Sequence, residues 1–174
     1  AYGSDGAQLN PELATIVLDE IGKTDIFTGV KKMDFEQAID QGMIVMIGDE
    51  VEEAYLDEVQ KQCVNPELAK EKGDTLKFVY TPFHGAGNKP VRKILKRIGF
   101  NNVVVVKEQE LPDGDFPTVE SPNPENKEGF KLAIGYAKEC GADLIVGTDP
   151  DSDRVGILVK NDKGEYVTFT GNQV

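Results

Sequence analysis

The chain has 174 residues, of which 39% are hydrophobic and 29% charged, an ordinary composition for a globular domain with its own core. Its formal net charge of −12 argues against general binding to nucleic acids or to anionic membranes. No apolar run approaches the roughly 18 residues of a membrane span, no signal peptide is visible, and Cys63 and Cys140 lack the spacing of a redox pair, so we expect a cytoplasmic protein with reduced thiols.

The first 74 residues are predicted to be mainly helical. A helix is expected over 12–21, because an Asn-Pro pair precedes it and Gly22 follows as a stop. Residues 25–74 alternate helical patterns with polar breaks, and Asp49 is expected to cap a helix over 51–62. Another Asn-Pro pair, at Asn65, predicts the start of a further short helix.

An α/β core is predicted to begin at about Thr75. The apolar run at 103–106 is typical of a strand that is buried on both faces. Other strand-like runs occur at 76–80, 143–146, 155–159 and 166–169.

Two helices are predicted between these strands. Asn88 is expected to cap the first, whose apolar residues follow helical spacing: Val91, Ile94, Leu95 and Ile98. The second is expected to begin at Asn123-Pro124 and to stop at Gly141, with an apolar face made of Phe130, Ala133, Ile134, Ala137 and Cys140.

The loop over 147–154 is too short for a helical crossover, so the strand after it should run antiparallel to the strand before it. Residues 161–164 then predict a hairpin turn. The expected fold class is α/β, a three-layer domain with a mixed sheet, β-α-β-α-β-β order and an antiparallel edge strand.

This short loop carries the most chemistry in the sequence, with carboxylates at Asp149, Asp151 and Asp153, followed by Arg154. Three negative charges held in one tight loop repel each other, and hard oxygen ligands of this kind select Mg²⁺, Mn²⁺ or Ca²⁺. An EF-hand is excluded because its sixth and twelfth positions would be Arg154 and Lys160 instead of Gly and Glu. The alternative interpretation is a solvated acidic turn that has no function.

Two other groups of residues have weaker signals. His84 is the only histidine, which excludes a histidine-based metal site, and the glycines after it either form a phosphate-binding turn or simply allow a tight one. A ligand-binding role for His84 is open beside a structural one. Five basic residues crowd one helix, where a solvated face is favoured over an anion site: Lys89, Arg92, Lys93, Lys96 and Arg97.

The acidic loop resembles the metal-binding loop of the α-D-phosphohexomutases, the phosphoglucomutase and phosphomannomutase family, which reads G-x-D-P-D-x-D-R. Residues 147–154 (GTDPDSDR) match every fixed position. Four more segments resemble family segments in the same order: 2–9 (YGSDGAQL), 81–87 (TPFHGAG), 121–125 (SPNPE) and 170–173 (TGNQ).

The resemblance implies a phosphoglucomutase that interconverts glucose 1-phosphate and glucose 6-phosphate through a phosphoserine and a bisphosphorylated intermediate. Asp149, Asp151 and Asp153 would ligate Mg²⁺, and Arg154 would contact phosphate as a catalytic and substrate-binding residue. A substrate contact by His84 is the alternative to its favoured structural role, and it rests on its place beside the glycines and not on the resemblance. Phosphomannomutase and phosphopentomutase are alternatives within the family. A non-catalytic Ca²⁺-binding module and a metal-dependent phosphatase are alternatives outside it.

The resemblance also implies a division of the chain. Residues 1–24 would end the first mutase domain, 25–74 would be a helical connecting segment, 75–167 would form the second domain, and 168–174 would start the third. We therefore expect a fragment that lacks the nucleophilic serine and is inactive alone, with a sugar phosphate and the missing mutase domains as partners, and without nucleic acid or membrane.

Overall fold

The computed structural model describes residues 2–174, so Ala1, the first residue of the predicted 1–24 segment, lies outside the described residues. The chain divides into two compact units, one ending at Met46 and one beginning at Ile47. Within residues 2–174, no helix combines the length and the apolar character that crossing a membrane requires.

The first unit contains two helices, α1 (Pro11–Gly22) and α2 (Phe35–Asp40). The Asn10 side chain caps α1 by accepting the Leu13 N–H at 2.9 Å, as its position before a proline predicts. The helix ends at Gly22, the expected stop, and Lys23 is its C-cap. No residue of α1 is buried, so its apolar side chains, Leu18 and Ile21 among them, stay exposed within this unit.

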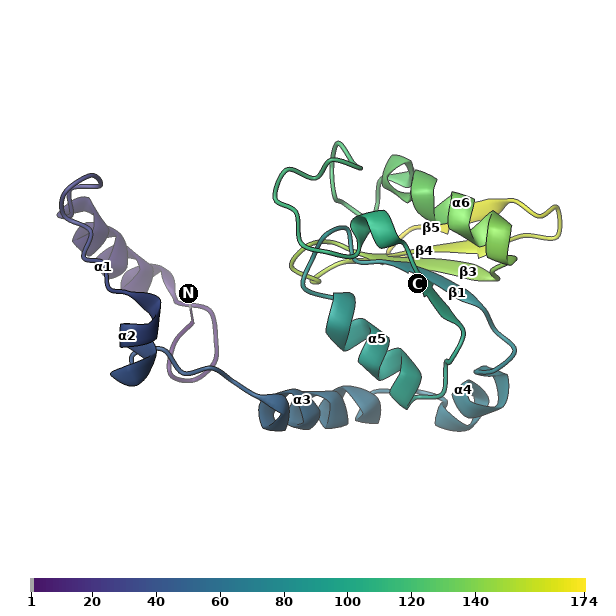
Figure 1. The fold of residues 1–174 in the computed structure, drawn as a ribbon, viewed down its shortest axis with the longest axis horizontal. Helices are drawn as coiled ribbons and strands as arrows, with labels where there is room; N and C mark the ends of the chain where they lie inside the picture. The colour runs from purple at the N-terminus through teal and green to yellow at the C-terminus, as the bar shows by residue number, and fades with distance from the viewer. Residues whose placement is uncertain (1) are drawn as a thin grey trace. The chain divides into compact units, whose positions relative to one another are not determined.

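The second unit is built on one five-stranded sheet with the order β2-β1-β3-β4-β5. The first three strands in this order run parallel, and β4 and β5 each run antiparallel to the strand before. Figure 1 shows α6 on one face of this sheet and α5 on the other. The strands are β1 (Phe78–Thr81), β2 (Val103–Val105), β3 (Leu144–Thr148), β4 (Val155–Lys160) and β5 (Tyr166–Phe169).

This arrangement confirms the α/β fold class with a mixed sheet and an antiparallel edge. The hairpin after β4 closes as expected, with the Gly164 N–H donating to the Asn161 carbonyl at 2.9 Å. The strand after this turn, β5, adds a third consecutive strand to the predicted β-α-β-α-β-β order. It runs to Phe169, beyond residue 167, the expected end of the α/β domain.

Two predicted helix caps in the second unit are displaced by one residue. The helix α3 (Asp49–Lys61) is capped by Gly48, which places Asp49 in the first turn instead of the cap. Similarly, Gly87 caps α5 (Asn88–Arg97), because the Asn88 side chain turns away and donates to the Glu110 carbonyl at 2.8 Å. Asn65 does cap α4 (Pro66–Lys72) as predicted.

The second crossover helix, α6 (Lys131–Cys140), begins later than the predicted Asn123-Pro124 start. The Asn123 side chain caps a tight turn there, accepting the Glu125 N–H at 2.9 Å, and a short 3-10 helix, η2 (Lys127–Phe130), intervenes. Gly141 ends α6 in the left-handed conformation, with φ of 69°, as predicted.

The apolar run at 103–106 does not form a strand that is buried on both faces. In β2 the three valines are half-buried, because β2 lies at the edge of the sheet and pairs only with β1 among the described strands. Val106, one residue beyond β2, is fully buried instead. A 3-10 helix, η1 (Lys107–Gln109), follows it.

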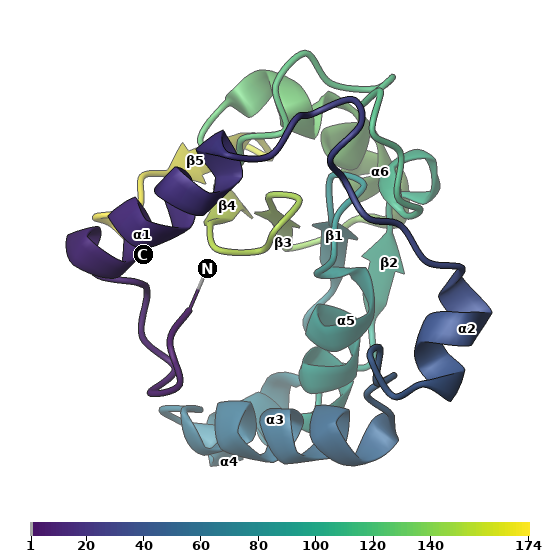
Figure 2. The ribbon, with the colours of Figure 1, turned by 90° about the vertical axis from the view of Figure 1, so that its left-hand side faces the viewer.

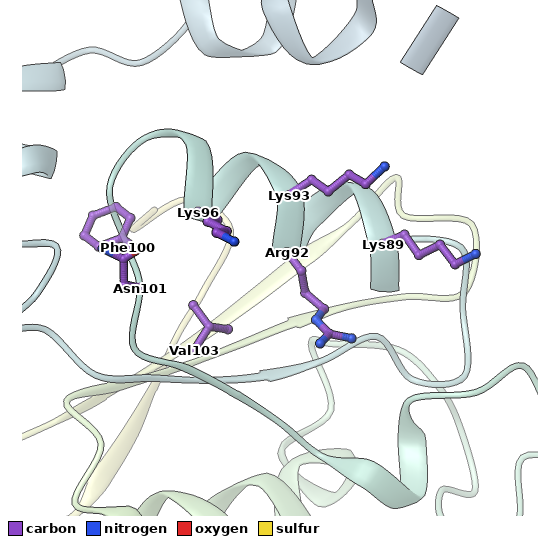
Figure 3. Close-up of a pocket in the computed structure, with 7 residues that line it drawn as sticks. All are labelled: Lys89, Arg92, Lys93, Lys96, Phe100, Asn101 and Val103. Atoms are coloured by element: carbon purple, nitrogen blue, oxygen red, sulfur yellow. The ribbon is translucent and has the colours of Figure 1, made fainter. Parts of the chain in front are cut away.

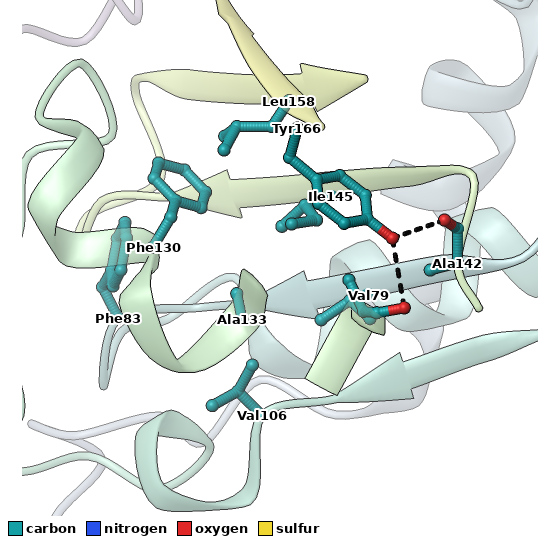
Figure 4. Packing of buried hydrophobic residues seen from close by; sticks show 10 residues of the cluster. Val79, Phe83, Val106, Phe130, Ala133, Ala142, Ile145, Leu158 and Tyr166 are labelled. Atoms are coloured by element: carbon teal, nitrogen blue, oxygen red, sulfur yellow. Dashed lines mark hydrogen bonds between the residues drawn. The ribbon is translucent and has the colours of Figure 1, made fainter. Parts of the chain in front are cut away.

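The main core lies between the sheet and α6 (Figure 4). Phe83 and Phe130 meet edge to face with ring centroids 5.2 Å apart. Tyr166 reaches the end of α6, where its hydroxyl lies 2.7 Å from the Ala142 carbonyl and 3.1 Å from that of Ala137. The buried cluster comprises Val79, Phe83, Val106, Phe130, Ala133, Ala137, Ala142, Ile145, Leu158 and Tyr166.

Candidate metal centre

The acidic loop is the turn of the β3–β4 hairpin. Thr148 pairs with Val155 in the last rung of the ladder, so residues 149–154 make the connection. This loop leaves the sheet at the carboxyl end of the parallel strand β3, the edge where ligands bind in open α/β sheets. Figure 2 looks onto this edge, with the β3–β4 loop facing the viewer.

Two paired glycines fix the base of the hairpin. Gly147 and Gly156 lie opposite each other in β3 and β4. A Cβ atom on Gly147 would lie 2.6 Å from the Phe130 ring, and one on Gly156 would lie 3.0 Å from that ring and 2.3 Å from the Pro124 carbonyl oxygen. Both positions therefore exclude a side chain, and the core packs directly against the two strands that carry the loop.

The loop gathers its three carboxylates. One oxygen from each of Asp149, Asp151 and Asp153 lies within 4.8 Å of the others. Asp149 is buried, with 8% of its surface exposed, whereas the other two are exposed. Its Oδ1 accepts the Arg154 N–H at 3.0 Å, and its carbonyl accepts the N–H of Ser152, a residue with φ of 62°. The loop thus closes on Asp149 through its own backbone.

The donor set suits a hard divalent cation. Carboxylate oxygens are the ligands that Mg²⁺ and Ca²⁺ take, and opposite ligands of one Mg²⁺ ion stand about 4.2 Å apart. Oxygens no more than 4.8 Å apart, two of them on exposed side chains, need only small rotations to reach that spacing. The residues present therefore fit a Mg²⁺ ion, and Asp149 is the most firmly held of the three carboxylates.

Arg154 contributes a cation at the rim of the loop. Its Nε lies 3.9 Å from oxygens of both Asp149 and Asp153, which is too long for a hydrogen bond. More than half of its side-chain surface, 56%, is exposed. The guanidinium balances the carboxylates at a distance and keeps its planar set of donors available to an anion.

Comparison with known proteins identifies the family to which this chain belongs. Residues 53–164 match the family model for phosphoglucomutase/phosphomannomutase, alpha/beta/alpha domain II. The chain belongs to the phosphoglucomutase/phosphomannomutase family.

Individual relatives agree with this assignment. The chain is 34% identical to a phosphoglucomutase of Staphylococcus saprophyticus over 173 residues, which cover 99% of this chain and 30% of that protein. It is 40% identical to a probable phosphomannomutase of Haemophilus influenzae over 130 residues, covering 75% and 26%. A phosphoribomutase of Saccharomyces cerevisiae is 35% identical over 184 residues, covering 99% and 29%. The chain thus spans about 30% of the length of these relatives.

The fold agrees too. The crystal structure of a putative phosphomannomutase from Thermus thermophilus superposes with a TM-score of 0.51 at 24% identity, over 67% of this chain and 25% of that one.

His84 lies beside this family's acidic loop but uses both ring nitrogens within the chain. Nδ1 lies 3.0 Å from the Leu111 carbonyl oxygen and Nε2 lies 3.0 Å from the Thr118 hydroxyl. Because a carbonyl only accepts, Nδ1 donates to Leu111, and the Thr118 hydroxyl occupies the other ring nitrogen. The residue is buried and ties the loop at 111–118 to the end of β1. A ligand contact by this ring would require one of these bonds to break.

The basic residues on α5 of this domain are largely used in ion pairs. Arg92 pairs with Glu110 at 2.6 Å, Lys93 pairs with Glu52, and Arg97 pairs with two carboxylates of α3. The contact with Glu52 raises the pKa of Lys93. These pairs join α5 to α3 and to the chain after β2, in line with a solvated face. Four basic side chains of α5 line an open pocket of about 440 Å³ beside Phe100 (Figure 3): Lys89, Arg92, Lys93 and Lys96.

Proposed function

We propose that this chain is the metal-loop domain of a phosphoglucomutase, which interconverts glucose 1-phosphate and glucose 6-phosphate through a phosphoserine on another domain. The convergence of three carboxylates and one arginine at the carboxyl end of β3, in a chain of this family, carries the proposal. A bound Mg²⁺ would neutralise charge on the phosphoryl group in transfer.

Each residue of the loop has a distinct task in this proposal. Asp149 is the fixed ligand, because its burial and its bond from the Arg154 N–H hold it in place. Asp151 and Asp153 are exposed and close on the ion from the outer side. Arg154 offers its guanidinium to phosphate oxygens. The nucleophile is elsewhere, since a segment resembling T-A-S-H-N-P does not occur in this chain, and we expect the isolated chain to be inactive.

Glucose phosphate is proposed over other sugars because several relatives that cover 99% of the chain are named phosphoglucomutase. Names of other relatives support mannose or ribose phosphates as alternatives within the same chemistry. A structural Ca²⁺ module differs by its metal, since it should prefer Ca²⁺ at submillimolar concentration.

The metal site is tested on the isolated chain by amide chemical shifts in a Mg²⁺ titration at constant ionic strength. We expect weak binding, about millimolar or poorer, because Mg²⁺ keeps several waters and rarely binds tightly to a few carboxylates. Shifts should centre on residues 149–154 and vanish in Asp149→Asn. Asp162→Asn, an exposed acidic residue of the next hairpin, is the matched control and should bind as the wild type does. Preferential Ca²⁺ binding below millimolar concentration, or shifts that persist in Asp149→Asn, would contradict the assignment.

The reaction is tested on the longer parent protein, with glucose 1-phosphate, mannose 1-phosphate and ribose 1-phosphate compared as substrates. Arg154→Lys should lower turnover while Mg²⁺ dependence persists, because an ammonium cannot reproduce the two parallel bonds of a guanidinium. Wild-type rates in this variant, or turnover by the isolated chain clear of contaminating enzyme, would overturn the roles proposed here.

A further inference from the structure

The turn after β1 lies directly against the acidic loop. In the parallel pair β1–β3, Thr81 stands opposite Gly147, so the segments that follow the two strands leave the sheet side by side. The Ala86 N–H donates to the Pro150 carbonyl at 2.8 Å. Phe83 and His84 both have positive φ, 44° and 64°, and bend the chain sharply enough to bring 85–87 back over the loop.

Gly85 makes the closest contact. A Cβ atom there would lie 2.3 Å from the Cα atom of Pro150 and 2.5 Å from its carbonyl oxygen. Both are backbone atoms, so no rotation of a side chain can make room. The conformation of Gly85 is not left-handed, so an alanine would be strained by this contact alone and not by its own backbone.

Gly87 makes the second contact, with hydroxyl groups instead of backbone. A Cβ atom there would lie 2.5 Å from the Ser152 Oγ, 2.7 Å from the Thr148 Oγ1 and 2.7 Å from the Tyr80 hydroxyl. The last two form a buried hydrogen bond of 2.9 Å across β1 and β3. Ser152 is exposed and can rotate away, whereas the buried Thr148–Tyr80 pair cannot. All three contacts are with side-chain atoms, so Gly87 holds the loop less rigidly than Gly85 does.

We propose that Gly85 and Gly87 are positioning residues for the metal ligands, with the turn at 84–87 setting where the acidic loop lies. This inference rests on the proposed metal site. Pro150 joins Asp149 to Asp151, so a shift of its backbone moves both carboxylates. An added Cβ on Gly85 has to displace Pro150 by about 1 Å to restore an ordinary contact, which exceeds the roughly 0.5 Å tolerance of a preorganised site.

The test compares Gly85→Ala and Gly87→Ala with two control variants of the whole chain. Gly73→Ala places a Cβ 2.0 Å from the Gly99 carbonyl oxygen, at the opposite end of β1, and is as crowded as Gly85→Ala but remote from the loop. Gly135→Ala, in α6, meets no atom within 4 Å apart from the neighbouring backbone of its own helix. For each variant, Mg²⁺ affinity is measured by amide chemical shifts at a temperature where the protein is folded, and stability is measured separately by urea unfolding in EDTA.

We expect Gly85→Ala to lose at least about tenfold in Mg²⁺ affinity, the usual effect of disturbing the groups that orient metal ligands. Gly87→Ala should lose less, because its contacts are with side-chain hydroxyls and not with the backbone of the loop. Gly73→Ala should lose stability and keep its affinity, and Gly135→Ala should keep its affinity without losing stability. If Gly85→Ala does not fold, the loss of affinity in Gly87→Ala relative to Gly73→Ala decides.

Two outcomes overturn different parts of the argument. Wild-type affinity in both Gly85→Ala and Gly87→Ala, while the wild-type chain binds Mg²⁺, would refute the positioning role and leave the metal site standing. A wild-type chain that shows no Mg²⁺ shifts in residues 149–154 would refute the proposed site and the positioning role with it.

Discussion

The Tyr166 hydroxyl provides a sharp test of how the core is held together. Tyr166 on β5 is buried, with 6% of its surface exposed, and its hydroxyl lies 2.7 Å from the carbonyl of Ala142, which is itself fully buried. Tyr166→Phe removes the donor and leaves this carbonyl buried without it. A buried polar group that loses its partner costs about 1–3 kcal/mol, so unfolding free energy should fall by about this amount.

Urea unfolding in EDTA, followed by far-ultraviolet circular dichroism, measures the effect. With a slope of about 2 kcal/mol per molar urea, the midpoint should fall by about 0.5–1.5 M. Tyr136→Phe is the matched control, because it removes a tyrosine hydroxyl that bonds Glu108 at 2.7 Å in an exposed position, where water can replace it. Equal midpoints for Tyr166→Phe and Tyr136→Phe would show that burial of this hydrogen bond does not determine its contribution.

Three further changes have defined outcomes. Asp151→Asn should stabilise the metal-free protein or leave it unchanged, because it relieves repulsion among the loop carboxylates; a lower melting temperature in EDTA would contradict this. Burial raises the pKa of Tyr80 to about 12 from 10, so the unfolded chain releases this proton first and stability should fall from pH 10 to pH 12. Tyr80→Phe should reduce that fall by at most about 3 kcal/mol in alkaline urea titrations, and an unchanged slope would refute the assignment. Gly135→Ala should gain about 0.5–1 kcal/mol in urea unfolding, because this exposed helical position has open space, and a loss would contradict it.

The sequence predicts most of the fold because local chemistry decides most of its elements. The Asn-Pro pairs begin α1 and α4, Gly141 ends α6, and the short acidic loop requires β4 to reverse direction. Where the prediction is wrong, contacts distant in sequence decide the outcome. Asn88 has a side chain that commonly caps a helix, yet this side chain donates to the carbonyl of Glu110, 22 positions away in sequence.

The position of β2 shows the same limit on another scale. Four consecutive valines predict burial on both faces, but periodicity within one segment does not reveal how many neighbours a strand will have. The sheet order places β2 at an edge, so its valines are only half-buried. The valine that is fully buried in the core with residues of α6 is Val106, just beyond the strand.

For the candidate site, too, one part can be predicted from the sequence and another cannot. Three carboxylates within five residues of one loop are visible in the sequence, because they are neighbours along the chain. The turn that packs against that loop is not visible in the sequence, since Gly85 and Pro150 are 65 positions apart and only the parallel pairing of β1 and β3 brings them together. The two glycines near His84 are the available signal, and they fit a phosphate-binding turn equally well.

The glycines around the acidic loop explain how so short a segment can hold three carboxylates close together. Gly147 and Gly156 let the Phe130 ring pack against the base of the hairpin, and Gly85 lets the turn after β1 pack against its side. With its base and one side fixed, the loop cannot open to relieve the repulsion among its carboxylates. The remaining routes are protonation, the nearby Arg154 guanidinium and a bound cation. A loop held in this way would accept the proposed ion without rearranging its backbone, as a preorganised site does.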